Sequence, residues 1–218
     1  AVAEAFNEMT TRLQASQRAQ RDLVANVSHD LKTPLTSIQG FAQALLDGAV
    51  QEPTAIQQAA QVIYDEADRM HRMVMDLLDL ARLDAGTMNL ERAPIDLREL
   101  LAASVQKYSF QAQQSQIDLK FETGDSAGEA PLIVVGDADR LTQVFSNLLD
   151  NALKFTPPGG QVQISLRSQG SWAKVDVADS GPGIAPQELE RIFERFYQTD
   201  KSRRGGNRRG VGLGLAIA

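Results

Sequence analysis

The residues best suited to chemistry in this 218-residue sequence are neighbours, His29 and Asp30, in the stretch Ser28-His29-Asp30-Leu31-Lys32-Thr33-Pro34-Leu35. An imidazole is a competent nucleophile near neutral pH, and an adjacent carboxylate can accept its proton as it attacks. Thr33 follows Asp30 by three residues, so on a helix it shares a face with Asp30 and could orient a water. A lone helical histidine is usually a solvated surface residue, and these neighbours are what favour a catalytic role.

A second group of polar residues lies in the stretch Asn147-Leu148-Leu149-Asp150-Asn151-Ala152-Leu153-Lys154-Phe155. Asn147 and Asn151 are one helical turn apart, and Lys154 lies nearly on the same face. Carboxamide oxygens suit magnesium bound to phosphates, and a lysine can reach a phosphate as a point charge. The alternative is an ordinary polar helix face, but asparagine is a poor helix former, which favours a functional site.

Two glycine-rich segments complete the candidate nucleotide site. In Asp179-Ser180-Gly181-Pro182-Gly183-Ile184, the glycines allow close approach to a flat ligand, and the carboxylate can accept from an exocyclic amine such as that of adenine. A plain strand-to-helix turn explains this segment equally well. The stretch from Lys201 to Leu215 is basic, glycine-rich and then helical, which predicts a lid ending at a phosphate-binding helix N-terminus. Its alternative is a basic loop that binds nothing specific.

Two long helices are expected to position the histidine. Residues 1–47 predict one helix with a heptad seam, from which His29 is turned toward water, and Pro34 predicts a bend. The second helix is expected to begin with Thr54 as its N-cap and to end near Gly86. Its apolar stripe comprises Ile56, Ala60, Ile63, Ala67, Met70, Val74, Leu77 and Ala81. A hairpin with two stripes has little core, which favours a dimeric four-helix bundle over packing on its own chain.

Residues 87–94 read as a linker, after which helices mix with strands. The pattern predicts a helix over 97–114, strands near 117–121 and 132–135, and a helix over 138–155 capped by Asp137. Alternation over 162–166 and 173–177, with a short link at 169–171, predicts an antiparallel pair. The second half is therefore expected to be an α+β sandwich, one sheet covered by helices.

Composition narrows the possible functions. The net charge of −6 argues against binding duplex nucleic acid. No apolar run approaches the length of a membrane helix, and no signal peptide is expected at the start of the sequence. The absence of cysteine excludes disulfides, thiol catalysis and cysteine-metal sites, and it fits a cytoplasmic protein. Since His29 and His71 are the only histidines, a multi-histidine zinc site within one chain is not expected.

A nucleophilic histidine and a separate nucleotide site in one chain indicate phosphoryl transfer to histidine. On these motifs the sequence resembles the cytoplasmic part of a sensor histidine kinase of a two-component system, over essentially its whole length. The matching segments are the H box Asn26–Leu35, N box Asn147–Phe155, first G box Asp179–Ile184, F box Ile192–Tyr197 and second G box Gly210–Ile217. Ala5–Met9, with Arg12 and Leu13, is also similar to the end of a HAMP signalling module.

The resemblance implies a domain order and a setting. Residues 1–22 would be a signalling helix, 23–87 the dimerisation and histidine phosphotransfer hairpin, 88–94 a linker, and 95–218 the catalytic ATP-binding domain. That domain would have the fold of gyrase- and Hsp90-type ATPases. Members of the family continue past the equivalent of Ala218 through two further strands, so a truncated domain is expected. The parent would be a membrane-anchored sensor, of which this chain is a cytoplasmic fragment without membrane contact of its own.

The resemblance also implies roles for single residues. His29 would be the phosphoacceptor and Asp30 its general base, with autophosphorylation from ATP followed by transfer to an aspartate of a response regulator receiver domain. Thr33, with Asp30, would position water in a phosphatase reaction. Asn151 would ligate Mg²⁺ with Asn147 close by, Lys154 would contact phosphate, and Asp179 would read adenine. The remaining cofactor-binding positions would be Phe155, Gly181, Gly183, Gly210, Gly212 and Gly214.

Two rival interpretations remain open at this stage. One is a simple ATPase of the same fold, which releases phosphate without forming phosphohistidine. By the resemblance, Asn147 stands where such enzymes carry the glutamate that activates water. The other is a non-enzymatic dimeric scaffold with an inactive nucleotide domain, against which Asn151, Asp179 and the glycine boxes argue.

Overall fold

The computed structural model describes residues 2–124, 131–198 and 212–218 and divides into two compact units, residues 1–78 and 79–218. The boundary falls inside a helix. Consequently, the last residues of the second helix belong to the same unit as the strands that follow them.

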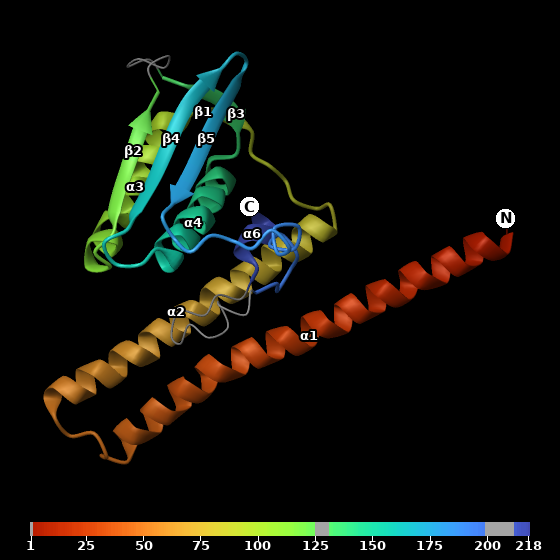
Figure 1. Cartoon of the computed structure of the whole chain (residues 1–218). Helices are drawn as coiled ribbons and strands as arrows, with labels where there is room; N and C mark the ends of the chain where they lie inside the picture. Colours follow the sequence, from red (N-terminus) through yellow and green to blue (C-terminus); the bar gives the residue numbers. More distant parts are fainter. Residues whose placement is uncertain (1, 125–130, 199–211) are drawn as a thin grey trace. The chain divides into compact units, whose positions relative to one another are not determined.

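The first unit is a helical hairpin, in agreement with the periodicity of the sequence. Its helices are α1 (Val2–Leu46) and α2 (Pro53–Asp84), shown in Figure 1. Left-handed glycines end both, because Gly48 has a φ of 65° and Gly86 a φ of 60°. The predicted N-cap at Thr54 is wrong. The helix already includes Pro53, whose fixed φ and missing amide suit a first helical turn.

The apolar stripe predicted on α2 is not the face that a single chain buries. In the described part of the hairpin, residues 25–78, the fully buried side chains are Pro34, Ala59 and Met73. Members of the predicted stripe are exposed to solvent, Ile56 by 42% and Val74 by 43%. Further large apolar side chains of the hairpin are exposed as well: Leu35, Phe41, Leu46, Met75 and Leu78. One copy of the hairpin therefore leaves a large apolar surface uncovered.

The second unit is an α/β domain. Its elements are the end of α2, then β1 (Ala93–Asp96), α3 (Leu97–Gln114), β2 (Asp118–Thr123), β3 (Ile133–Gly136), α4 (Ala138–Phe155), β4 (Gln161–Gln169), β5 (Trp172–Asp179) and α6 (Gly214–Ile217). The antiparallel hairpin of β4 and β5 is confirmed, and β4 pairs in parallel with β2 on its other side.

The expectation of one sheet is wrong, because the hydrogen bonds of the described strands form two. One sheet has the order β2-β4-β5, and the other pairs β1 antiparallel with β3. β1 was missed because it has four residues, includes Pro94, and lies partly in the segment that reads as a linker. Its pairing with β3 ties the chain entering the domain to the strand that leads into α4.

Helices α3 and α4 lie on one face of the three-stranded sheet and bury its apolar side chains (Figure 1). Each helix begins as its sequence dictates. The Asp96 carboxylate accepts from the backbone amide of Arg98, and the Asp137 carboxylate accepts from that of Arg140. The core includes Leu97, Leu101, Tyr108, Phe145, Leu149, Leu153, Val162, Ile164 and Leu166. This core fixes which face of α4 remains available for polar residues.

Within the described residues, no helix is both long enough and apolar enough to cross a membrane.

Candidate active site

His29 lies on α1 with 73% of its side chain exposed, as the heptad pattern predicts. Its Nδ1 is 3.1 Å from Oδ1 of Asp30, whose side chain is 26% exposed. When the carboxylate accepts a hydrogen bond from Nδ1–H, the lone pair of Nε2 remains available to attack an electrophile. The pair therefore presents a nucleophilic nitrogen to solvent and holds a proton acceptor behind it.

Thr33 and Pro34 follow on the next turn. The Thr33 hydroxyl donates to the backbone carbonyl of His29 at 3.4 Å, a long contact that leaves the hydroxyl easily redirected. Pro34 is fully buried and has no amide, so it cannot bond to the carbonyl of Asp30 four residues earlier. The backbone next to the histidine is therefore less constrained than elsewhere in α1.

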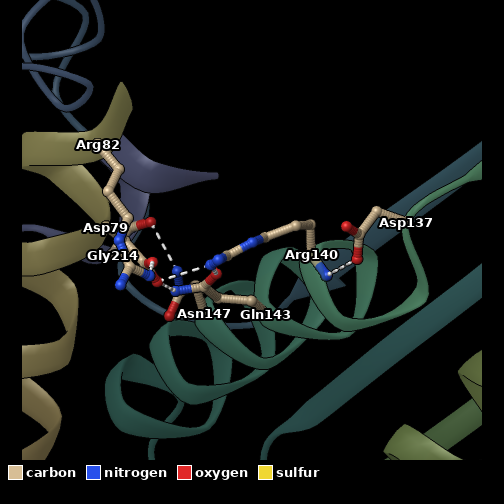
Figure 2. Close-up of polar contacts among 7 residues, drawn as sticks. All are labelled: Asp79, Arg82, Asp137, Arg140, Gln143, Asn147 and Gly214. Carbon is tan, nitrogen blue, oxygen red and sulfur yellow. Dashed lines mark hydrogen bonds and ion pairs between the residues drawn. The ribbon is translucent and has the colours of Figure 1, made fainter. Parts of the chain in front are cut away.

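The candidate nucleotide residues of the N box lie on α4. Asn147 donates from Nδ2 to the carbonyl of Gly214 at 3.0 Å, so the second G box is joined directly to this helix (Figure 2). That bond leaves the carboxamide oxygen of Asn147 able to accept or ligate. Asn151 is half-buried one turn further on, and the Lys154 ammonium lies 4.8 Å from the centre of the Phe155 ring.

The first G box lies against the end of the same helix. A Cβ added at Gly181 would lie 2.9 Å from the carbonyl oxygen of Phe155 and 2.6 Å from Oδ1 of Asp179. The Gly181 amide donates to that carboxylate oxygen at 2.8 Å, which orients Asp179 at the end of β5. At Gly183, where φ is 67°, an added Cβ would meet nothing within 4 Å. Glycine is thus required at Gly181 by space and at Gly183 by backbone conformation.

The F box and the second G box meet through the backbone. The amide of Phe196 donates to the carbonyl of Gly212 at 2.8 Å, and Phe196 itself has a φ of 61°. A Cβ at Gly212 would lie 2.6 Å from the carbonyl of Tyr197. The two G boxes therefore each lie against the N-box helix α4, and the F box is joined to the second G box.

Gly210 and the predicted lid residues up to position 211 lie outside the described residues. His29, Asp30 and Thr33 lie in the first unit, whereas the nucleotide-site candidates lie in the second.

One polar cluster was not foreseen from the sequence. Asp79, near the end of α2, is 5% exposed and accepts from Arg140 at 2.7 Å and from Gln143 at 2.8 Å (Figure 2). Burial alone would raise the pKa of Asp79, but the hydrogen bonds from Gln143 and Arg140, with the charges of Arg140 and Arg82, lower it below its ordinary value. The signal available in the sequence was a carboxylate set between Leu78 and Leu80.

A second carboxylate, that of Asp137, joins the segment before β1 to the start of α4. Asp137 accepts from the amide of Arg140 at 3.1 Å and from the amide of Glu91 at 3.0 Å. These backbone hydrogen bonds lower the pKa of Asp137. Further along α2, Asp84 pairs with Arg195 of the F box, and the hydrogen bond from that guanidinium lowers the pKa of Asp84.

Comparisons with known proteins agree with this arrangement. Residues 19–86 match the family model of the His Kinase A (phospho-acceptor) domain, and residues 136–218 match that of the histidine kinase-, DNA gyrase B- and HSP90-like ATPase. The catalytic domain of histidine kinase ThkA is 31% identical over 58% of this chain and 78% of that one, with a TM-score of 0.50. This chain belongs to the sensor histidine kinase family.

Other members of the histidine kinase family match most of the chain. Sensor protein SrrB of Staphylococcus aureus (strain MRSA252) is 35% identical over 198 residues, which cover 91% of this chain and 33% of SrrB. Full-length ShkA, solved with AMPPNP, is 32% identical with a TM-score of 0.63, covering 90% of this chain and 39% of ShkA. ThkA in complex with response regulator protein TrrA is 27% identical with a TM-score of 0.64, covering 82% of this chain and 51% of that one.

These matches confirm the family resemblance and the fold class, a helical region followed by an α/β ATPase-type domain. The chain spans about a third of the length of the SrrB relative.

Proposed function

We propose that this chain is the kinase core of a two-component sensor: it transfers the γ-phosphoryl group of ATP to His29 and then to an aspartate of a response regulator receiver domain. The observation that carries the proposal is an exposed histidine, held through Nδ1 by Asp30, in a chain that also contains an ATPase-family domain. A simple ATPase would have no use for an exposed histidine paired with a carboxylate, as His29 is with Asp30.

The geometry at His29 supports a specific course for the first step. Nε2 attacks the γ-phosphorus, the bond from phosphorus to the bridging oxygen breaks, and ADP leaves with that electron pair. As positive charge develops on the imidazole, Asp30 accepts the Nδ1 proton at 3.1 Å and stabilises the ring. In the second step, the phosphoryl group passes to the regulator carboxylate, and the proton returns to the ring.

Residues of the second unit are proposed to hold the nucleotide. Asp179, oriented by the Gly181 amide, accepts from the adenine amine, and the open space at Gly183 admits the ring beside the backbone. Lys154, in the last turn of α4, is proposed to contact phosphate. Phe155 and the glycines at 181, 183, 210, 212 and 214 shape the site, with Gly210 outside the described residues.

The donor set suits magnesium. Among the described residues no group of three histidine, cysteine, aspartate or glutamate side chains could hold a metal, so carboxamide oxygens and phosphate oxygens would supply the ligands. Asn151 is the proposed ligand, and Asn147 lies one turn away on the same helix. The side-chain oxygen of Asn147 remains available to the ion, because the hydrogen bond to Gly214 is made by its Nδ2. The ion would neutralise charge on the transferred phosphoryl group.

Two partners are proposed. A second copy of the hairpin would cover the exposed stripe that includes Ile56 and Val74 and so complete a four-helix bundle. A response regulator would dock to receive the phosphoryl group, as the complex of ThkA with TrrA suggests. The domain limits given above, and a cytoplasmic location in a membrane-anchored sensor, are part of the same proposal.

A phosphatase reaction on the regulator is proposed to use Thr33. Its hydroxyl and the Asp30 carboxylate lie one turn apart on α1, where together they can hold a water for hydrolysis of the regulator's acyl phosphate. Replacement of Thr33 by alanine is expected to reduce dephosphorylation of the regulator and to leave labelling of His29 intact.

The test of the proposed function uses γ-labelled Mg-ATP. Label on the protein should be acid-labile and alkali-stable, as a phosphorus–nitrogen bond requires, and His29→Gln should abolish it while nucleotide binding persists. His71→Gln is the matched control, because His71 is also an exposed helical histidine and should leave labelling unchanged. Release of inorganic phosphate with no label on the protein would instead identify a simple ATPase.

A further inference from the structure

The last turns of α2 contain a buried carboxylate, that of Asp79. Among the buried polar side chains of the described residues, Asp79, Ser104, Thr156 and Ser165, only Asp79 is ionisable as an acid. It precedes a buried leucine, Leu80, and lies at the first position of the second compact unit. A carboxylate withdrawn from water is costly unless hydrogen-bonded partners compensate it, so its surroundings must supply them.

The partners come from the N-box helix. Oδ2 of Asp79 accepts from the guanidinium of Arg140 at 2.7 Å and from the carboxamide of Gln143 at 2.8 Å. Arg140 also donates to Gln143 at 2.9 Å, and the guanidinium of Arg82 lies 4.0 Å from the other oxygen of Asp79. In Figure 2 the side chains of Arg140, Gln143 and Asp79 converge between the two helices.

A second ion pair acts in the same direction. Asp84, in the last turn of α2, pairs with both terminal nitrogens of Arg195 in the F box. Both side chains are about half exposed, so solvent screens the attraction within this pair. The two clusters together fix six residues of α2, Asp79 to Asp84, on the ATP-binding domain.

The helix that holds this cluster also holds the nucleotide candidates. Arg140, Gln143 and Asn147 are spaced by three and four residues, which places them along one face of α4. Asn147 in turn donates to Gly214 of the second G box. The end of the hairpin and the glycine box are therefore attached to successive turns of one helix.

The reaction cycle requires these parts to rearrange. His29 must be reached first by the nucleotide and then by the regulator, and the two cannot occupy one imidazole together. The ATP-binding domain must therefore move relative to the hairpin, either by bending α2 near Leu78 or by releasing its end. Bending breaks backbone hydrogen bonds inside a helix, each worth about 1 kcal/mol. Releasing a buried ion pair into water costs little net free energy, because both charges regain their hydration.

We propose that Asp79, Arg140 and Gln143 form a charged latch that docks the end of α2 on the N-box helix and opens once in each phosphotransfer cycle. Asp79 and Arg140 are thus positioning residues of the reaction and act through the placement of the ATP-binding domain. This inference rests on the proposed function, because only a domain that serves His29 and then yields it needs to be released.

The test exploits the absence of native cysteine. In the full chain, Asp79→Cys with Gln143→Cys is bridged by a short bis-methanethiosulfonate reagent, and the bridge is later removed with reductant. Three quantities are measured on each sample: affinity for a fluorescent ATP analogue, labelling of His29, and transfer of the label to a receiver domain. The single variants Asp79→Cys and Gln143→Cys, treated with the same reagent, are the matched controls.

The bridged protein should bind the analogue as the reduced protein does and should lose at least one of the two transfer steps by tenfold or more. Reductant should restore both steps in the same sample, which shows that the fold was retained. Equal rates of both steps with and without the bridge would overturn the latch, as would loss of nucleotide binding on bridging. Absence of label in the unsubstituted chain would overturn the proposed function itself.

A charge exchange gives a second, independent measurement. Asp79→Arg alone places two guanidinium groups together and should open the latch, so that labelling of His29 changes severalfold at unchanged nucleotide affinity. Asp79→Arg combined with Arg140→Asp restores opposite charges and should return labelling toward the original rate. A double variant no closer to the original than the single one would contradict the ion pair's role.

Discussion

The exposed histidine of the hairpin and the polar face of α4 are built on opposite principles. His29 is 73% exposed and has one polar partner, whereas Asp79 is 5% exposed and has two direct donors with further charge nearby. A phosphoacceptor, the role proposed for His29, must be presented to two different partners in turn, which is possible only if neither is bound permanently. A nucleotide site receives the same ligand at every cycle, and it can be fixed by many internal contacts.

This contrast has a consequence for substitutions. Around His29, a change should alter the reaction and leave the folding free energy nearly unchanged, because few contacts are lost. Around α4, the same groups support the fold and the proposed nucleotide site, so activity and stability should fall together. Four substitutions, in order of decreasing effect, test this difference.

The largest effect is expected at the histidine. Asp30→Asn keeps an oxygen that can accept from Nδ1 but removes the charge that takes the proton, so labelling of His29 should slow by about 10²–10⁴-fold. The urea midpoint should stay close to that of the unsubstituted chain. Asp65→Asn is the control, since Asp65 is an exposed helical carboxylate with a glutamine partner at 2.8 Å. A normal labelling rate in Asp30→Asn would remove Asp30 from the mechanism.

The next effect concerns the first G box. Gly181→Ala would place a Cβ 2.6 Å from Oδ1 of Asp179 and 2.9 Å from the carbonyl oxygen of Phe155, so backbone must shift. A displacement of this kind at a binding site should weaken nucleotide binding by about 10²-fold, measured by titration with a fluorescent ATP analogue. The thermal midpoint should fall as well. Unchanged affinity would mean that this backbone does not line the nucleotide site.

A smaller effect is expected at the latch. Asp79→Asn retains an acceptor for Gln143 but leaves Arg140 without its counter-charge, at a cost of about 1–3 kcal/mol in unfolding free energy. Because the pKa of Asp79 is lowered from 3.8, its contribution is complete above pH 3.8 and is lost as the pH falls through the lower folded value. Urea midpoints of the two proteins should therefore differ at pH 7 and converge in acid. A constant difference down to acid pH would be inconsistent with a charged Asp79.

The smallest effect should have the opposite sign. A Cβ added at Gly40, inside α1, would meet nothing within 4 Å, so Gly40→Ala should stabilise the chain by about 0.5–1 kcal/mol through helix propensity. The measurement is the shift in the urea midpoint. Together with Gly181→Ala it applies one substitution to both regions, and destabilisation at both positions would erase the contrast between them.

Local features of the fold were predictable from the sequence because they rest on local chemistry. Helix α4 was predicted at its observed limits, since its apolar period is regular and Asp137 caps it. Pairing between distant strands carries no such signal. The separate sheet of β1 and β3 depends on residues about 40 positions apart, and the proline and short length of β1 concealed it.

The same division applies to the site. Glycines that permit close approach, such as Gly181, could be recognised from their place after a strand. The hydrogen bond from Asn147 to Gly214 and the burial of Asp79 could not, because each depends on which element packs against the helix. The apolar stripe predicted on α2 lies on a helix as expected, but members such as Ile56 and Val74 are exposed in one chain. Periodicity alone does not tell whether the same chain or another copy covers such a stripe.

The two ends of the connection between α2 and β1 are secured by backbone hydrogen bonds. The amide of Thr87 donates back to the carbonyl of Arg82, and the amide of Glu91 donates to Asp137 at the start of α4. Only four residue steps separate these two anchors, a span of about 14 Å when fully stretched. Even with the ion pairs released, a connection this short would keep the ATP-binding domain tethered at the end of α2, so its nucleotide would not be delivered to the imidazole by free diffusion.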